Sequence, residues 1–395
     1  MWTAPGRQYF HYATDAPIGN EYAFYSAAYA VHEARWKDVA IQIVYHPGHG
    51  WNVDRMARSV QASLEEFSKR FGPYPYREIR LVEHVGEGIS LHAPPINISY
   101  QEGFSLLNSN EDPRDVDFAF AVVAHEVAHQ WWGDQVTPAR VEGAALLSES
   151  LAWYSAMSVV ERTYGAKHLE RFLGILREAY LTPQSRAGVP LLQASDWFMA
   201  YRKGPFAMYA LREYVGNTQV TTALRRLFEQ HRSATPPLAT SLDLYRELQL
   251  VTPDSLRYLL SDLFESNTYW QVATTQASAE QVEAGKWRVT LDVKARKVVV
   301  DTIGVEKEVS MNDLVEIGAF GPPKDGGPGE PLYLRMHRVH SGEQRITVMV
   351  TGKPARAGLD PRNLLIDVNG DDNLQEVTLS AMKSAADTGA APKRR

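Results

Sequence analysis

The chain has 395 residues, of which 44% are hydrophobic and 22% charged. This is the composition of an ordinary globular protein with room for two or three domains. The formal net charge of −6, from 41 Lys and Arg against 47 Asp and Glu, gives no electrostatic footprint for nucleic acid. The absence of cysteine excludes disulfides, a thiol nucleophile and metal sites with Cys ligands. No apolar run approaches about 18 residues and no signal peptide is evident, so the chain as given is expected to be soluble.

The first third of the sequence predicts a small sheet and one helix. Alternating apolar residues predict a strand over 38–45. Apolar positions then recur at spacings of three and four, which predicts a helix with Asn52 as N-cap and a stop at Gly72. Two further strands are expected at 78–83 and 96–100.

The rest of the chain predicts a helical region followed by short strands. The expected helices are 115–132, 144–163, 167–181, 196–214, 217–231, 241–250 and 254–265. The expected strands are 287–293, 297–303, 332–336, 345–350 and 363–368, which suggest a small antiparallel β-sandwich. The acidic run 367–373 lacks the residues of an EF-hand loop and predicts a hairpin with its turn at Asn369-Gly370. Residues 380–395 are expected to be a disordered tail.

A metal-binding pattern lies in the first of the predicted helices. His125 and His129 are four residues apart, so in a helix they lie about 40° apart on one face and about 6 Å apart along the axis. Two imidazoles so placed can bind one metal ion. Glu126 lies about 100° around from His125, where it can take a proton from a metal-bound water without being a ligand. The alternative is two core histidines and a surface glutamate at accidental spacing.

A catalytic zinc site needs a third protein ligand. A metzincin would have glycine and histidine at the positions of Trp132 and Gln135, which excludes that class. Glu149 is available in the next predicted helix, and its neighbours at i−4, i+3 and i+7 are all alanine. Such a face lets the two helices approach closely. The alternative is a surface glutamate in ion pairs, but the neighbouring apolar residues make this helix look buried, and buried carboxylates need partners.

The segments HEVAHQWWGDQVT (125–137) and SESLAWY (148–154) resemble the gluzincin aminopeptidases, the family of aminopeptidase N and leukotriene hydrolase. The resemblance implies that His125, His129 and Glu149 bind one Zn²⁺ per chain and that Glu126 is the general base. It extends to FGPYPYREIRLVE (71–83), and in all covers about residues 35–265.

Tyr201-Arg202-Lys203-Gly204 matches the YxKG motif of the same family. By that resemblance, Tyr201 stabilises the tetrahedral oxyanion with its phenol. The alternative reading of Tyr201 is an ordinary aromatic residue at a helix end.

The resemblance implies an α+β fold: a thermolysin-like catalytic domain with a helical bundle, followed by a small β-sandwich. The expected domains are a remnant β segment of an N-terminal domain (1–45), the catalytic domain (46–268), the β-sandwich (269–379) and the tail (380–395).

Three departures from the family pattern stand out. The spacer 130–148 has 19 residues where the family usually has 18, and the extra residue is expected in the loop 138–143. Ala156 stands where a carboxylate usually supports the ligands, and loss of such a partner can lower metal affinity or activity about 10–100-fold.

The third departure concerns substrate binding. Residues 90–95 replace the G(A/G)MEN exopeptidase motif, so Ala93 stands where a glutamate would bind the substrate's free amine. Glu87 and Glu142 are the alternative acids.

The sequence therefore predicts a zinc-dependent metallopeptidase with an altered amine-binding site and a peptide substrate. The alternative is a catalytically weak or inactive zinc-bearing domain of a membrane protein, with a peptide-binding or regulatory role. HPGHGWNVDRM (46–56) resembles peptidase-like domains of bacterial transporter-permease chains. By that resemblance the chain is expected to be the soluble end of a larger membrane protein, with a cytoplasmic protein as the alternative. Side-chain specificity and oligomeric state are not predicted.

Overall fold

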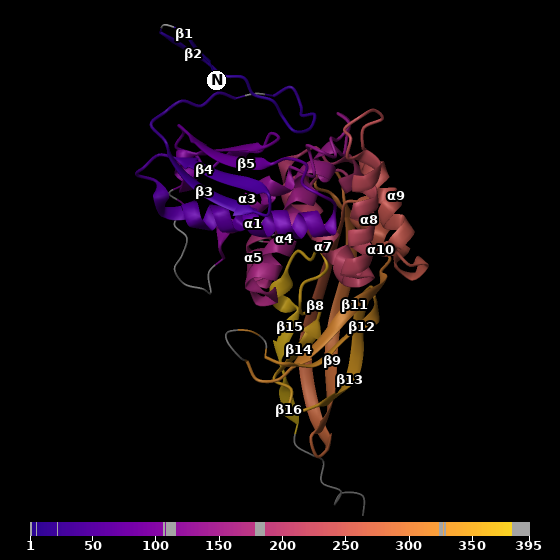
Figure 1. Ribbon diagram of the computed structural model, residues 1–395. Helices are drawn as coiled ribbons and strands as arrows, with labels where there is room; N and C mark the ends of the chain where they lie inside the picture. Colours follow the sequence, from indigo (N-terminus) through magenta and orange to yellow (C-terminus); the bar gives the residue numbers. More distant parts are fainter. Residues whose placement is uncertain are drawn as a thin grey trace, which may run out of the picture. The chain divides into compact units, whose positions relative to one another are not determined.

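The computed structural model describes residues 2–4, 6–21, 23–105, 107, 116–177, 186–323, 327 and 329–380. The chain forms two compact units, one of Met1–Glu178 with Pro190–Glu265 and one of Ala179–Val189 with Ser266–Arg395. The first unit combines a sheet with helices and the second consists of strands (Figure 1). This confirms the predicted α+β fold with a helical region followed by a β-sandwich.

A five-stranded sheet begins the first unit. Its order is β3 (Ala30–Trp36), β4 (Val39–Tyr45), β5 (Glu78–His84), β7 (Asn97–Gln101) and β6 (Leu91–His92). The three central strands, β4, β5 and β7, are parallel, and each edge strand is antiparallel to its neighbour. The carboxyl ends of the central strands therefore meet at one edge of the sheet. Because β3 and β4 pair within this sheet, residues 30–45 belong to it, while the domain boundaries given above stay a prediction.

The first long helix, α1 (Val53–Arg70), lies along this sheet (Figure 1). Its apolar stripe, including Met56, Val60 and Leu64, is fully buried, as the spacing of three and four predicts. Asn52 precedes the helix but makes no capping bond with its side chain. Its amide instead donates to the carbonyls of Ser105 and Leu107, at 3.2 and 2.7 Å.

Further helices complete the first unit. They are α2 (Glu102–Ser105), α3 (Phe118–Ala128), α4 (Leu151–Tyr164), α5 (Ala166–Arg177), α7 (Gly204–Val215), α8 (Asn217–His231), α9 (Ser241–Val251) and α10 (Arg257–Phe264). Short 3₁₀ turns lie at Gly50–Asn52, Leu191–Gln193 and Asp254–Leu256. The predicted helices form, but the one expected over 115–132 ends at Ala128. Two π-turns, η2 (Leu146–Ser150) and η5 (Met199–Lys203), precede α4 and α7. The predicted ends at 115 and 178–181 lie outside the described residues.

The second unit is a sandwich of two sheets (Figure 1). One holds β10 (Glu306–Val309), β9 (Lys286–Val300), β8 (Thr268–Glu283) and β16 (Thr378–Ser380), with β13 (Gly342–Thr351) also paired to β9. The other holds β12 (Pro331–His340), β11 (Asn312–Phe320), β14 (Arg356–Leu359) and β15 (Leu374–Glu376). A separate hairpin of β1 (Trp2–Ala4) and β2 (Arg7–Tyr9) lies near the start of the chain.

Two predictions in this unit are wrong. The strands expected at 287–293 and 297–303 are one continuous strand, β9. The strand expected at 363–368 and the hairpin turn at Asn369-Gly370 do not form, and Gly370–Asp372 is a 3₁₀ turn. The reason lies in Asp360, whose carboxylate accepts the backbone N–H groups of Leu364 and Leu365. These side-chain bonds take the place of ladder bonds at Leu364 and Leu365. The rest of the segment pairs with β8 only through an isolated bridge between Asp367 and Trp270.

Within the described residues, no helix combines the length and apolar character needed to span a bilayer. Most of the tail predicted at 380–395 lies outside the described residues.

Candidate metal centre

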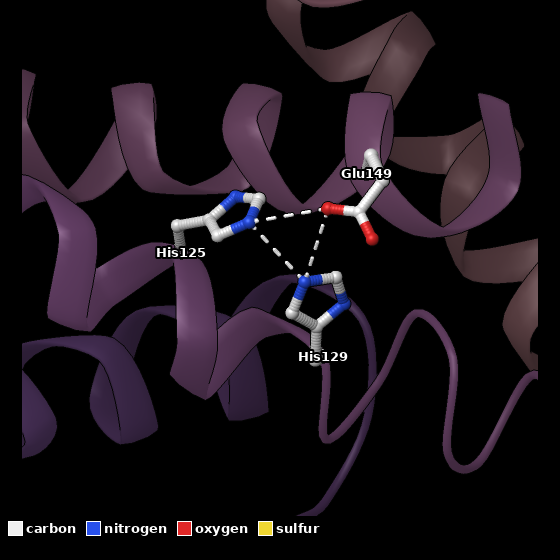
Figure 2. A group of neighbouring side chains, drawn as sticks. All are labelled: His125, His129 and Glu149. Carbon is white, nitrogen blue, oxygen red and sulfur yellow. Dashed lines mark hydrogen bonds and ion pairs between the residues drawn. The ribbon is translucent and has the colours of Figure 1, made fainter. Parts of the chain in front are cut away.

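Three of the predicted site residues converge in the first unit. His125 lies on α3, His129 caps the end of that helix, and Glu149 lies in the π-turn that begins the next long helix. The Nε2 atoms of His125 and His129 are 3.2 Å apart, and Oε2 of Glu149 lies 3.3 Å from the first and 3.4 Å from the second. Figure 2 shows the two rings and the carboxylate pointing toward one another.

The triangle of these three atoms fits a zinc ion. Zinc binds imidazole nitrogen and carboxylate oxygen at about 2.0–2.2 Å in a tetrahedron, whose edges are then about 3.3–3.6 Å. Oε2 of Glu149 is buried and, within the described part of the chain, has no hydrogen-bond partner other than these charged contacts. Three protein ligands leave the fourth position of a tetrahedral ion for water or substrate, as in catalytic zinc sites.

The two imidazole rings are held in different ways. Nδ1 of His129 donates to the carbonyl of Trp132 at 3.0 Å, which leaves its Nε2 free to bind a metal. The His125 ring stacks on Trp153, with ring centres 4.4 Å apart, but its buried Nδ1 has no acceptor among the described residues. A metal-bound histidine usually donates from its second nitrogen. The missing acceptor agrees with Ala156, which stands where the family has a carboxylate. The stack on Trp153 orients the His125 ring instead.

Burial and charge set the protonation of the triad. Burial lowers the pKa of His125. Burial also lowers the pKa of His129, but its hydrogen bond and attraction to Glu149 outweigh that effect and raise the pKa to about 9. Burial opposes the charge of Glu149, yet the two imidazoles bring the pKa of this carboxyl well below its usual range. A metal ion therefore meets an ionised carboxylate at Glu149 and competes with a proton for the imidazole of His129.

Glu126 lies beside the triad without joining it. Its side chain is buried, and its Oε1 is 4.0 Å from Nε2 of His125. This is the place that helical geometry predicts for the residue after the first histidine. A carboxylate here can accept a proton from a molecule that lies against the triad.

Tyr201 lies in the second π-turn, with its ring 6.0 Å from that of His125 and stacked on Trp197. Burial raises its pKa above the ordinary value, and the nearby carboxylates of Glu149 and Glu126 raise it further. The phenol therefore stays protonated near the triad and is available as a hydrogen-bond donor.

A contact between the two π-turns places Tyr201 relative to Glu149. Ser150 Oγ donates to the carbonyl of Ala200 at 2.7 Å. Gly204 lies against Ser150, because a Cβ at 204 would overlap Ser150 Oγ and lie 2.6 Å from its Cβ. Sequence reasoning missed the role of Ser150, although it lies inside the motif that carries Glu149. π-Turns are frequent at functional sites.

The π-turn at Leu146–Ser150 also bears on the long spacer. A π-turn closes over one residue more than an α-turn. It therefore offers a second place for the nineteenth spacer residue, besides the predicted loop 138–143.

A cleft of about 520 Å³ opens beside Glu149 and Tyr201. Its other charged lining residues are Arg140 and Asp196, neither of which sequence reasoning singled out. Oδ1 of Asp196 accepts the N–H of Met199 at the start of the π-turn, which positions this acid at the cleft.

The two acids suggested for amine binding are not brought into this cleft. The side chains of Glu87 and Glu142 are exposed, and among the described residues neither lines the cleft nor pairs with the triad. The segment that contains Ala93 contacts the residue next to His129. Buried Gln130, which directly follows His129, accepts the N–H of Ile96 at 2.8 Å and donates to the carbonyl of Pro94 at 3.2 Å.

Sequence comparisons relate this chain to known peptidases. Residues 97–263 match the Peptidase family M1 domain. Aminopeptidase N of Lactobacillus delbrueckii subsp. lactis is 26% identical over 229 residues, which cover 52% of this chain and 27% of that protein. The thyrotropin-releasing hormone-degrading ectoenzyme of Mus musculus is 30% identical over 124 residues, which cover 28% of this chain and 11% of the ectoenzyme. The chain thus spans about a quarter or less of the length of these relatives.

A solved structure supports the fold. The crystal structure of Legionella pneumophila aminopeptidase A in complex with aspartic acid superposes with a TM-score of 0.57 over 89% of this chain and 38% of that one, at 16% identity. The stretch 97–263 contains the triad, Glu126 and Tyr201. The fold and the arrangement of these residues resemble those of gluzincin peptidases. Over residues 97–263 the chain is similar to the M1 peptidases, and over 229 residues it is similar to an aminopeptidase N.

Proposed function

We propose that this chain is a zinc-dependent peptidase that hydrolyses peptide bonds in the cleft beside Glu149. The observation that carries the proposal is the convergence of one atom each from His125, His129 and Glu149 at 3.2–3.4 Å. Glu126, a proton acceptor, and Tyr201, a hydrogen-bond donor, both lie beside His125. A module that only binds peptides needs neither of them.

The triad would hold one Zn²⁺. When bound, the ion would lower the pKa of a water molecule to about 7 and polarise the scissile carbonyl. Glu126 accepts the proton of the attacking water and delivers it to the leaving amine. Tyr201 donates a hydrogen bond to the oxygen on which negative charge develops. Its raised pKa keeps that proton in place, since the adjacent carboxylates favour the neutral phenol.

The substrate is proposed to be a peptide whose free amine is not strongly required. Ala93 offers no carboxylate, and the exposed positions of Glu87 and Glu142 favour neither as the amine-binding group. Asp196 is the acid on the cleft wall, and it becomes the leading candidate where a free amine is preferred.

Removal and return of zinc test this proposal. Chelated protein should hydrolyse peptides far more slowly than protein as purified, and added Zn²⁺ should restore the rate. The His125→Ala/His129→Ala variant should not be restored, because it lacks two of the three ligands. If hydrolysis survives in that variant, the triad is not the catalytic centre. If folded, zinc-loaded wild type binds peptides but turns none over, the alternative of an inactive binding or regulatory domain replaces the peptidase.

A further inference from the structure

A second group of metal-ligating side chains lies in the first unit and shares no residue with the triad. His49 follows β4, Glu83 is the penultimate residue of β5, and Glu102 comes directly after β7. One ligand atom of each lies within 4.8 Å of the others. The three strands are parallel neighbours, so these side chains meet at the carboxyl edge of the sheet, where sheets of this kind usually bind ligands.

Glu83 is the buried centre of this cluster. Its side chain is 2% exposed, and a buried carboxylate needs a partner to offset the loss of water. Its Oε1 contacts Nδ1 of His49, and its Oε2 accepts the backbone N–H of His46 at 2.7 Å. In the ranges that the structure describes, no Lys or Arg pairs with Glu83. One imidazole thus faces two carboxylates, and close carboxylates repel each other unless a cation lies between them.

The surrounding contacts hold the three segments in place before any ion binds. Tyr29 donates from its hydroxyl to the carbonyl of Glu83 at 2.8 Å. Burial raises the pKa of Tyr29, and the charges of Glu83 and Glu102 raise it further. The bonds from Asn52 to Ser105 and Leu107 tie the start of α1 to the segment that follows Glu102.

The ligand set indicates the class of ion. Carboxylate oxygen alone suits Mg²⁺ and Ca²⁺, whereas imidazole suits zinc, iron, nickel and copper. One imidazole with two carboxylates therefore favours a divalent transition metal such as Zn²⁺ or Mn²⁺.

We propose that His49, Glu83 and Glu102 form a second divalent transition-metal site, which fastens the loop after β4 to the ends of β5 and β7. This ion is additional to the one that the sequence predicts, and the proposal does not rest on peptidase activity. The competing explanation is a histidine–glutamate ion pair with a neighbouring acid.

The test loads the chelated full chain with Zn²⁺ alone and measures bound metal after gel filtration. We expect about two ions per chain in wild type and about one in His125→Ala/His129→Ala, which leaves the second cluster intact. Adding Glu102→Gln to that variant should remove the remaining ion. His92→Ala is the matched control, because His92 pairs with Glu21 at 2.7 Å without a third ligand and should bind zinc as wild type does.

Thermal unfolding gives a second readout. Zn²⁺ should raise the Tm of His125→Ala/His129→Ala and should leave the Tm unchanged once Glu102→Gln is added, because only folded protein holds the site. The proposal is overturned if His125→Ala/His129→Ala retains no zinc, or if Glu102→Gln leaves its zinc content unchanged. A wild type with a single ion that is lost with His125 and His129 also overturns it. A single ion that is lost with Glu102 would instead overturn the catalytic triad.

Discussion

Gly204 lies directly against Ser150, at the point where the π-turn of Glu149 meets the π-turn of Tyr201. The hydrogen bond from Ser150 to the carbonyl of Ala200 joins the same two turns. Position 204 therefore requires glycine for a steric reason, because a side chain there would push apart the segments that carry Glu149 and Tyr201.

Gly204→Ala tests this contact. The added methyl group overlaps Ser150, so we expect a loss of about 1–3 kcal/mol in the free energy of unfolding and a lower kcat. Denaturant unfolding and steady-state kinetics measure the two effects. Gly174→Ala is the control, because a Cβ there meets no atom within 4 Å and alanine favours a helix by about 1 kcal/mol. Equal stability and activity for Gly204→Ala and wild type would contradict the packing described here.

Tyr201→Phe removes the phenolic donor and leaves the ring that stacks on Trp197. We expect kcat for peptide hydrolysis to fall about 10²–10³-fold, as for loss of one oxyanion donor, while KM stays nearly constant. That pattern marks an interaction made mainly in the transition state. An effect on KM alone would make Tyr201 a substrate-binding residue.

Free and N-acetylated forms of one peptide should be hydrolysed with similar kcat/KM. A desolvated ammonium needs an acid beside it, and Ala93 stands where the family has one. A preference for the free amine above about 10²-fold, or about 2.7 kcal/mol, would contradict this expectation. If that preference then disappeared in Asp196→Asn, Glu87→Gln or Glu142→Gln, the substituted residue would be the acid that binds the amine.

Asp134 gives a pH dependence of stability. Burial raises the pKa of its carboxyl to about 6, although Tyr76 donates to it at 3.0 Å and acts in the opposite direction. The unfolded chain has an aspartate pKa of about 3.9. Between these values the folded state holds a proton that the unfolded state has lost, so the free energy of unfolding falls as the pH rises through this window.

Asp134→Asn should remove that dependence. Because the amide carries no charge, the stability of the variant relative to wild type should rise by about 1–3 kcal/mol from about pH 4 to pH 7. Urea unfolding at several pH values measures the difference. Parallel stability curves for the two proteins would refute the assignment.

Sequence reasoning located most of the candidate site because its spacing follows from helix geometry. His125, Glu126 and His129 lie on one helix, so their relative directions are fixed by 3.6 residues per turn. The positions of Glu149 and Tyr201 rest on motif resemblance, and the π-turns that present them have no period that a sequence pattern reveals. The second cluster was missed because His49, Glu83 and Glu102 come from three separate strand ends, which only the sheet topology brings together.

The β-sandwich was predicted as a class, but its strands were less well predicted. β8 pairs with β9 through two irregular positions, at Thr274/Gln276 and Gln281/Glu283. Such bulges shift the alternation of inward and outward residues, so a long strand lacks a single two-residue period. The failed hairpin has a different cause, since the bonds that Asp360 makes with Leu364 and Leu365 are not visible as a pattern.

The central claim is that His125, His129 and Glu149 hold zinc while Glu126 transfers the proton. The most direct measurement compares zinc content and peptide hydrolysis in wild type, Glu126→Gln and His129→Ala. Glu126→Gln should keep the zinc content of wild type and lose about 10²–10⁴-fold or more in kcat. His129→Ala should lose both activity and about one equivalent of zinc. Hydrolysis by Glu126→Gln at the wild-type rate, or full zinc retention by His129→Ala, would contradict the account.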